Sequence, residues 1–141
     1  MFGNFALVAA SLFMGAAIYI TWAEHPARLR TDDRALLAQW KFSYARGFIM
    51  QATLAVVGFV FGVLEWIVTG GWMWLAGAVV LVANWPYTML VIMPTNTQLE
   101  AIAPDHAGPA SRTLILSWGR LHAVRSLLGT VATMIFLWAS L

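Results

Sequence analysis

The chain has 141 residues, of which 61% are hydrophobic and 10% are charged, whereas soluble domains usually carry about 25% charged residues. This composition predicts a single integral membrane domain, and the net charge of +2 is too small to indicate binding to nucleic acid. The absence of cysteine excludes disulfides, thiolate metal sites, iron–sulfur clusters and cysteine nucleophiles.

The first predicted membrane span covers residues 5–23, which are apolar apart from small hydroxyl side chains. Pro26 is expected to end this helix, with Glu24 and His25 at its exit. The segment has no basic region at its start and no small-x-small cleavage pattern at its end. We therefore expect a retained span and not a removed signal peptide.

A polar stretch, residues 28–34, precedes the second predicted span, residues 48–68. Thr31 or Asp32 can cap a helix there, because their side-chain oxygens accept hydrogen bonds from free backbone N–H groups. The helix is expected to continue without a break into the span, so its first turns lie at the interface or in water.

The sequence Thr69-Gly70-Gly71 predicts a tight turn into the third span, residues 72–93. Pro86 is expected to kink this helix because proline has no backbone N–H. A polar loop rich in proline and glycine follows. The fourth span, residues 113–139, is expected to begin its helix near Ser111.

These four spans predict an all-α integral membrane four-helix bundle, up-down-up-down, in which residues 1–141 form one domain. The polar residues fall on the side where the two longer loops lie, and they predict a polar pocket there. The basic residues of that side are Arg28, Arg30, Arg34, Lys41, Arg46 and Arg112. Basic residues mark cytoplasmic loops, so we expect the pocket on the cytoplasmic side and both termini outside, in a bacterial inner membrane.

One face of the fourth span carries the most unusual residues. Trp118, His122, Arg125 and Gly129 have the spacing i, i+4, i+7 and i+11, which places them on one side of a helix. Ionisable groups inside a bilayer are costly unless they face protein or water. His122 has the chemistry of a general base or a metal ligand; the structural alternative is a histidine bonded to a neighbouring helix. Arg125 can stabilise an anionic substrate oxygen, with an ion pair to Glu24 as its structural alternative.

Further polar and aromatic residues on the same side complete the predicted site. Amide and hydroxyl groups can orient a substrate oxygen, and they also hold membrane helices together. Tryptophans can stack on a flat substrate or anchor the chain at the interface. The predicted catalytic residues are His122, His25, Arg125 and Asn96. The predicted substrate contacts are Trp118, Tyr44, Gln51, Asn84 and Trp40.

Two histidines and a carboxylate also form a candidate metal set, because imidazole and carboxylate groups bind iron, copper or zinc. The predicted metal ligands are His25, His122 and Glu24, without the HxxH or HxxxH spacing that would strengthen the prediction. The cofactor is left open between none beyond O2, a bound iron or copper ion, and haem.

Several sequence blocks resemble one known family. His25-Pro26 ends the first span, Pro94-Thr95-Asn96 follows the third, and Trp118-Gly-Arg-Leu-His122-Ala-Val-Arg125 opens the fourth. Over essentially its whole length, the chain is similar to the anthrone oxygenase-like membrane proteins, whose fungal members are associated with oxidising an anthrone to an anthraquinone. The resemblance implies oxidative chemistry on a flat, phenolic or quinone-like substrate. It also matches His25, Asn96, His122 and Arg125 to polar positions of the family.

The leading interpretation is a membrane oxygenase or oxidoreductase that uses His122 and His25. In it a histidine base removes a proton and an arginine stabilises the resulting enolate, which reacts with O2; alternatively, a metal at His25 and His122 activates O2. One alternative is a non-enzymatic module that binds or transports a lipophilic small molecule; polar groups on only one side weaken the case for transport. Another is a haem- or copper-binding redox protein with two histidine ligands. The expected partners are the lipid bilayer and a lipophilic substrate. Gly58 and Gly62 predict close helix packing, either within the chain or in a homo-oligomer.

Overall fold

The computed structural model describes all 141 residues as four helical rods joined end to end, with no strands. The first rod comprises α1 (Phe2–Tyr19), a π-helix (Ile20–Glu24) and α2 (His25–Arg28), and the second is α3 (Asp33–Thr69). The third comprises α4 (Trp72–Val82), α5 (Asn84–Tyr87), a π-helix (Thr88–Ile92) and α6 (Met93–Ala101). A short 3-10 turn (Pro104–His106) leads to the fourth, α7 (Pro109–Ser140).

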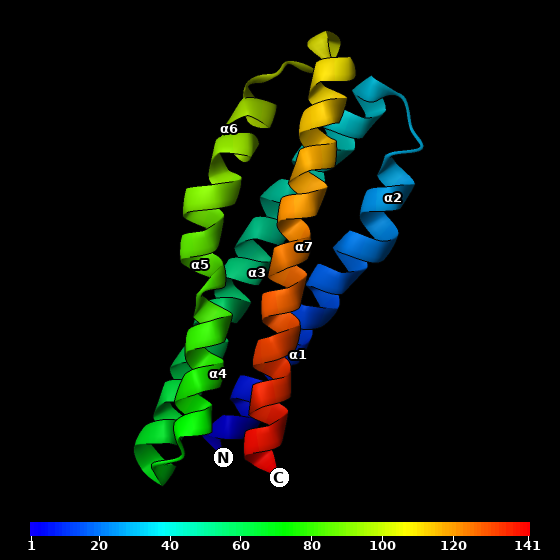
Figure 1. Ribbon diagram of the computed structural model, residues 1–141. Helices are drawn as coiled ribbons and strands as arrows, with labels where there is room; N and C mark the ends of the chain where they lie inside the picture. The colour runs from blue at the N-terminus through cyan, green and yellow to red at the C-terminus, as the bar shows by residue number, and fades with distance from the viewer.

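The rods run up, down, up and down, so both termini lie at one end and the two longer loops at the other (Figure 1). Each rod is long and apolar enough to cross a membrane. The chain is therefore an integral membrane protein, and the predicted all-α bundle is confirmed. At 37 residues, α3 is about 55 Å long at 1.5 Å per residue, which exceeds the roughly 30 Å of a hydrocarbon core.

Local sequence explains where α3 begins and ends. The Asp32 side chain accepts a hydrogen bond from the Ala35 N–H at 2.9 Å, as the capping prediction required. This bond holds the pKa of the Asp32 carboxyl below its usual range. At the other end Gly70 has a φ of 71°, a left-handed conformation that glycine adopts without strain. The predicted Gly-Gly turn follows.

The prediction that Pro26 ends the first helix was wrong, because the rod continues to Arg28. A π-helix lies directly before two short helices that have proline as their second residue, α2 with Pro26 and α6 with Pro94. The last N–H before each proline bonds five residues back, His25 to the Ile20 carbonyl and Met93 to the Thr88 carbonyl. The wider turn accommodates a residue that has no N–H of its own.

Two hydrophobic clusters hold the rods together. The terminal cluster, in the half that carries the termini, consists of Ala6, Ala10, Phe13, Ala17, Ala55, Trp74, Ala78, Leu81, Ala132 and Phe136. The loop-side cluster consists of Leu36, Leu37, Trp40, Ile92, Leu99, Ile115 and Trp118. The small residues predicted to mark close packing do so within the chain: a Cβ on Gly62 would lie 2.9 Å from the Ala78 Cβ.

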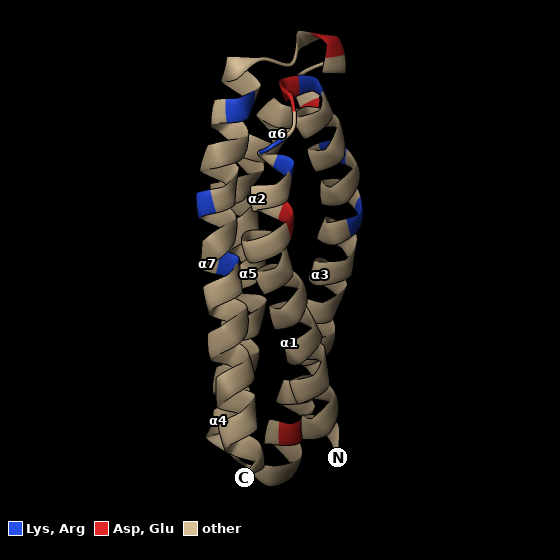
Figure 2. Cartoon of the chain, turned by 90° about the vertical axis from the view of Figure 1, so that its right-hand side faces the viewer, with Lys and Arg blue, Asp and Glu red and all other residues tan.

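Charge is distributed unevenly along the bundle. Lys and Arg are confined to the half with the longer loops (Figure 2). In that half Arg112 donates to the Asp33 carboxylate at 2.5 Å and to the Leu29 and Thr31 carbonyls, which fastens the first loop to α7. Glu65 lies at the opposite end and accepts the Gly3 N–H at 2.7 Å, which satisfies a free donor in the first turn of α1.

Candidate functional site

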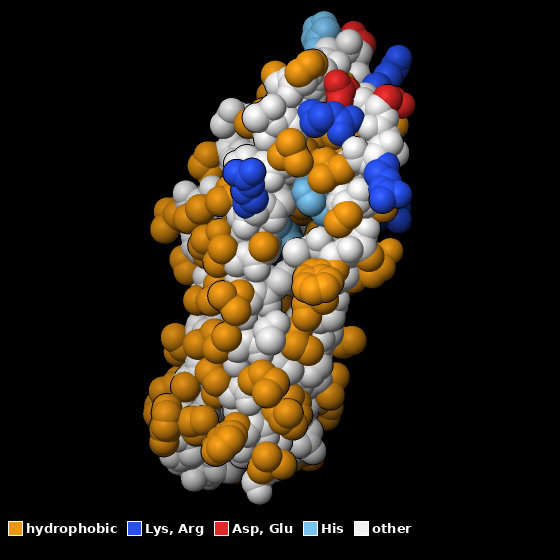
Figure 3. Space-filling view, turned by 45° about the vertical axis from the view of Figure 1, so that its right-hand side comes forward, with side chains coloured by type: hydrophobic (Ala, Val, Ile, Leu, Met, Phe, Trp, Pro, Cys, Tyr) orange, Lys and Arg blue, Asp and Glu red, His pale blue; other side chains and the backbone are white.

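Two adjoining pockets lie inside the bundle, between the two hydrophobic clusters. The His122 pocket is lined by Ile20, Ser43, Tyr44, Gly47, Phe48, Gln51, Ile92, Asn96, Trp118, His122 and Arg125. The Trp85 pocket is lined by Phe48, Gln51, Ala52, Ala55, Asn84, Trp85, Thr88, Met89 and Arg125. The pockets share Phe48, Gln51 and Arg125. Histidine side chains are visible in a recess of the charged half, while apolar side chains cover the other half (Figure 3).

The fourth rod turns its polar face inward, as the sequence pattern predicted. Trp118, His122, Arg125 and Gly129 are all buried on α7. The rings of Trp118 and His122 stack with their centroids 4.9 Å apart. The stack fixes the His122 ring beside the pocket, and its Nδ1 is bonded to Thr21, so Nε2 is the ring nitrogen left free for a ligand.

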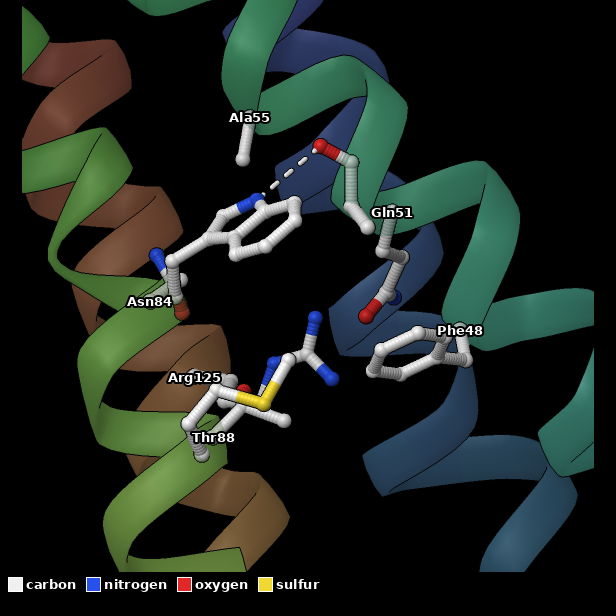
Figure 4. A pocket seen from close by; sticks show the side chains of 9 residues that line it. Phe48, Gln51, Ala55, Asn84, Thr88 and Arg125 are labelled. Atoms are coloured by element: carbon white, nitrogen blue, oxygen red, sulfur yellow. Dashed lines mark hydrogen bonds between the residues drawn. The ribbon is translucent and has the colours of Figure 1, made fainter. Parts of the chain in front are cut away.

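Arg125 is a buried cation without a counter-ion. Its side chain forms no ion pair or hydrogen bond, its Nε is buried and unpaired, and only 8% of the residue is exposed. The guanidinium lies 5.6 Å from the centroid of the Phe13 ring and points into the Trp85 pocket toward Gln51 (Figure 4). The ion pair with Glu24 that the sequence left open does not form, because Glu24 pairs with Arg28 at 2.6 Å.

Amide and hydroxyl groups around Arg125 also lack partners. The buried atoms without a hydrogen bond include Asn96 Nδ2 and Oδ1, Asn84 Oδ1, Gln51 Nε2 and Thr88 Oγ1. Buried polar atoms are nearly always paired with protein, water or a ligand. Since these atoms belong to residues that line the two pockets, the pockets contain unpaired hydrogen-bond donors and acceptors.

Three predicted site residues, His25, Trp40 and Glu24, do not line either pocket. Trp40 is fully buried behind Tyr44, with ring centroids 4.9 Å apart, and meets Trp118 edge-on at 5.9 Å. The His25 ring packs against the Trp118 ring, with the two centroids 5.8 Å apart. A Cβ at position 119 would collide with the His25 Nε2, so Gly119 is required for this approach. Trp40 and His25 therefore support Trp118, which lines the His122 pocket, and do not line the pocket themselves.

The predicted metal ligands do not form a three-ligand site. The Glu24 carboxylate is already occupied by Arg28, by the Ser43 hydroxyl and by the Gln39 amide at 2.9 Å. No group of three His, Cys, Asp or Glu side chains converges anywhere in the chain. The residues present therefore do not fit the metal set of Glu24, His25 and His122.

Sequence reasoning missed several polar residues of this region. Arg28 was assigned to the polar loop, but only 3% of it is exposed, and its guanidinium lies 5.7 Å from the Trp118 ring centroid. The i,i+4 spacing of Glu24 and Arg28 was the available signal. Thr21 and Ser126 were also missed, because small hydroxyl residues are common in membrane helices and carry no distinctive pattern.

Comparisons with known proteins agree on one family. The family model described as anthrone oxygenase matches residues 40–135. An anthrone oxygenase of Aspergillus fumigatus is 30% identical over 135 residues, covering 86% of this chain and 82% of the relative. An anthrone oxygenase of Claviceps purpurea is 30% identical over 138 residues, covering 87% of this chain and 79% of the relative. No solved structure matches the chain.

Proposed function

Since the chain belongs to the anthrone oxygenase family, we propose that it oxidises a lipophilic, phenolic or quinone-like substrate with O2 inside the two pockets. Two relatives that carry this name match along most of their length. The resemblance noted in the sequence is thereby confirmed at the level of the family, and an oxygenase-type activity follows from it.

The observation that carries the proposal is the unpaired buried cation. A buried charge without a partner is unfavourable by several kcal/mol, and Arg125 has no protein anion within reach to offset this cost. Arginine suits an oxyanion because its planar donors match the lone pairs of oxygen. A substrate oxygen that becomes negative during reaction would supply the missing partner, with Gln51 and Asn84 beside it.

The chemistry needs a proton acceptor and an oxyanion site in one cavity. His122 removes a proton from the CH2 group between the two aromatic rings of an anthrone-type substrate. The electron pair moves to the ketone oxygen, which becomes an enolate stabilised by Arg125. The enolate carbon adds O2 to give a hydroperoxide, and loss of water leaves the quinone. One oxygen atom enters the product and the other leaves as water, so the four-electron oxidation of the substrate balances the reduction of O2.

The surface around the Trp85 pocket supports a substrate that arrives from lipid. An apolar groove lined by Phe48, Ile49, Ala52, Thr53, Val56, Val57 and Trp85 lies on the outside of the bundle. It shares Phe48, Ala52 and Trp85 with the Trp85 pocket. The Trp85 Nε1 donates to the Ala52 carbonyl at 3.2 Å and so joins α5 to α3 at this boundary. A flat apolar molecule dissolved in the bilayer would meet the pocket here.

The test is turnover of an anthrone under 18O2 by purified protein in lipid nanodiscs. We expect one O2 consumed per anthrone, one 18O atom in the quinone, and a rate well above the protein-free oxidation of the same anthrone. Metal content and the optical spectrum are measured on the same sample, so that a bound iron, copper or haem is detected independently. Tight binding of the anthrone without O2 consumption would instead identify a binding or transport protein.

We also propose that the pocket half faces the cytoplasm, as the basic residues near its loops indicate. These residues all lie on one side of the bundle (Figure 2). Because the chain has no cysteine, a single cysteine can report the orientation. A cysteine replacing Asp105, in the loop between α6 and α7, should be protected from a membrane-impermeant maleimide in intact cells. One replacing Gly71, in the tight turn, should be labelled; the reverse pattern would contradict the proposal.

A further inference from the structure

A chain of hydroxyl groups, here called the relay, leads away from the Nδ1 of His122. The His122 Nδ1 lies 3.2 Å from the Thr21 Oγ1. Thr21 Oγ1 lies 2.9 Å from the Ser126 Oγ, which in turn donates to the Ala17 carbonyl at 2.9 Å. Neither Thr21 nor Ser126 lines either pocket, so of the pocket-lining residues these hydroxyl groups contact only His122.

The end of this chain determines where its hydrogens lie. A carbonyl oxygen only accepts, so the Ser126 hydrogen is directed to Ala17. The Ser126 oxygen then accepts from Thr21, whose single hydrogen is used in that bond. The Thr21 oxygen is left as an acceptor, and the His122 Nδ1 must carry the hydrogen between them. If Thr21 donated to His122 instead, two oxygen atoms 2.9 Å apart would face each other with no hydrogen between them.

The local backbone places the four groups opposite one another. Ala17 and Thr21 lie one helical turn apart on the first rod, and His122 and Ser126 lie one turn apart on α7. Thr21 belongs to the π-helix Ile20–Glu24, an irregularity that is frequent at functional sites. The first rod contacts α7 through α1 and through the π-helix, so the two pairs of residues face each other inside the bundle.

We propose that Thr21 and Ser126 are positioning residues that hold His122 in the tautomer with hydrogen on Nδ1, leaving a bare Nε2 as the proton acceptor. The relay rests on the proposed role of His122 in proton abstraction. A histidine with hydrogen on Nε2 would present a donor to the substrate and could not take its proton. The relay thus selects which ring nitrogen serves the reaction before the substrate binds.

The first measurement is independent of activity. In protein labelled with 15N-histidine, the 15N shifts of His122 should report a hydrogen on Nδ1 in the wild type. Thr21→Val keeps the shape of threonine without its hydroxyl, and in this variant we expect a mixture of tautomers. With only three histidines in the chain, single His→Asn variants assign the signals. A wild-type His122 with its hydrogen on Nε2 would overturn the relay, whether or not the protein oxidises anthrones.

The second measurement is kinetic. Thr21→Val and Ser126→Ala are expected to lower kcat by about 10- to 100-fold, the usual effect of removing a partner that orients a functional histidine, with little change in KM. Thr21→Ser should restore the rate, because it restores the hydroxyl. The matched control is Thr133→Val, since Thr133 is also buried on α7 but bonds only to the Gly129 carbonyl of its own helix. Normal kcat in Thr21→Val with an altered tautomer would refute the positioning role; wild-type protein without turnover would refute the proposed function and leave the tautomer result standing.

Discussion

Replacing His122 with asparagine is expected to lower kcat for anthrone oxidation by about 10²- to 10⁴-fold, the range observed when a general base is removed. The asparagine amide can still donate to the Thr21 Oγ1, which His122 Nδ1 contacts at 3.2 Å, but it offers no basic nitrogen to the pocket. The loss should therefore reflect proton transfer and leave substrate binding largely intact. Steady-state O2 consumption with the anthrone, together with binding measured under anaerobic conditions, separates the two effects.

The matched control is His106→Asn. His106 lies in the loop before α7, with 79% of its side chain exposed, and its replacement should leave both kcat and KM unchanged. If His122→Asn retained kcat within about threefold, while its melting temperature and anthrone affinity were normal, proton abstraction by His122 would be excluded, since a lost general base costs far more than that. His25→Asn then becomes the next variant to measure, because His25 packs against the same tryptophan ring.

Replacing Arg125 with methionine is expected to lower kcat by about 10²- to 10³-fold, as removal of an oxyanion-stabilising donor does in other enzymes. Stability should not fall with it. Methionine fills much of the same space and removes a buried cation that has no counter-ion, a change that is often neutral or stabilising. The measurements are kcat for the anthrone and the thermal unfolding temperature in the same lipid or detergent.

Arg120→Met provides the control on the same helix, because Arg120 is exposed while Arg125 is buried. It should change neither quantity, apart from interactions with lipid headgroups. If Arg125 had only a structural role, Arg125→Met would instead have a lower unfolding temperature and a normal kcat. The kcat of Arg125→Lys should lie between those of the wild type and Arg125→Met, because a lysine keeps the charge but loses the planar set of donors.

The sequence was a reliable guide to the helices because its signals there are local. Asp32 caps α3 as its position indicated, and Gly70 takes the left-handed conformation that the Gly-Gly turn required. Pro26 was misjudged because its effect depends on the preceding turn. Once residues 20–24 widen into a π-helix, the proline fits and the rod continues to Arg28.

The site could be predicted where its residues share one helix. It was harder to predict where a side chain's position depends on contacts with other helices. The spacing of Trp118, His122 and Arg125 correctly placed them on one buried face. The structure also brings Tyr44, Gln51, Asn84 and Asn96 to the pockets, while their catalytic and binding roles stay predictions. Sequence spacing could not show that His25, Trp40 and Glu24 lie outside the pocket lining. The side chain of each is held away from the pockets by a partner on another helix or another turn. Arg28 was missed for the same reason, since its burial depends on Glu24 and Ser43.

The terminal cluster shares only Ala55 with the residues that line the pockets. Packing at that end is set by alanines, by close glycines and by the stacked Trp74 and Phe136, whose ring centroids lie 5.8 Å apart. Mutations that reshape the pockets therefore leave most of this packing untouched. Such a division leaves the residues that line the pockets free to vary without disturbing the packing that assembles the four rods.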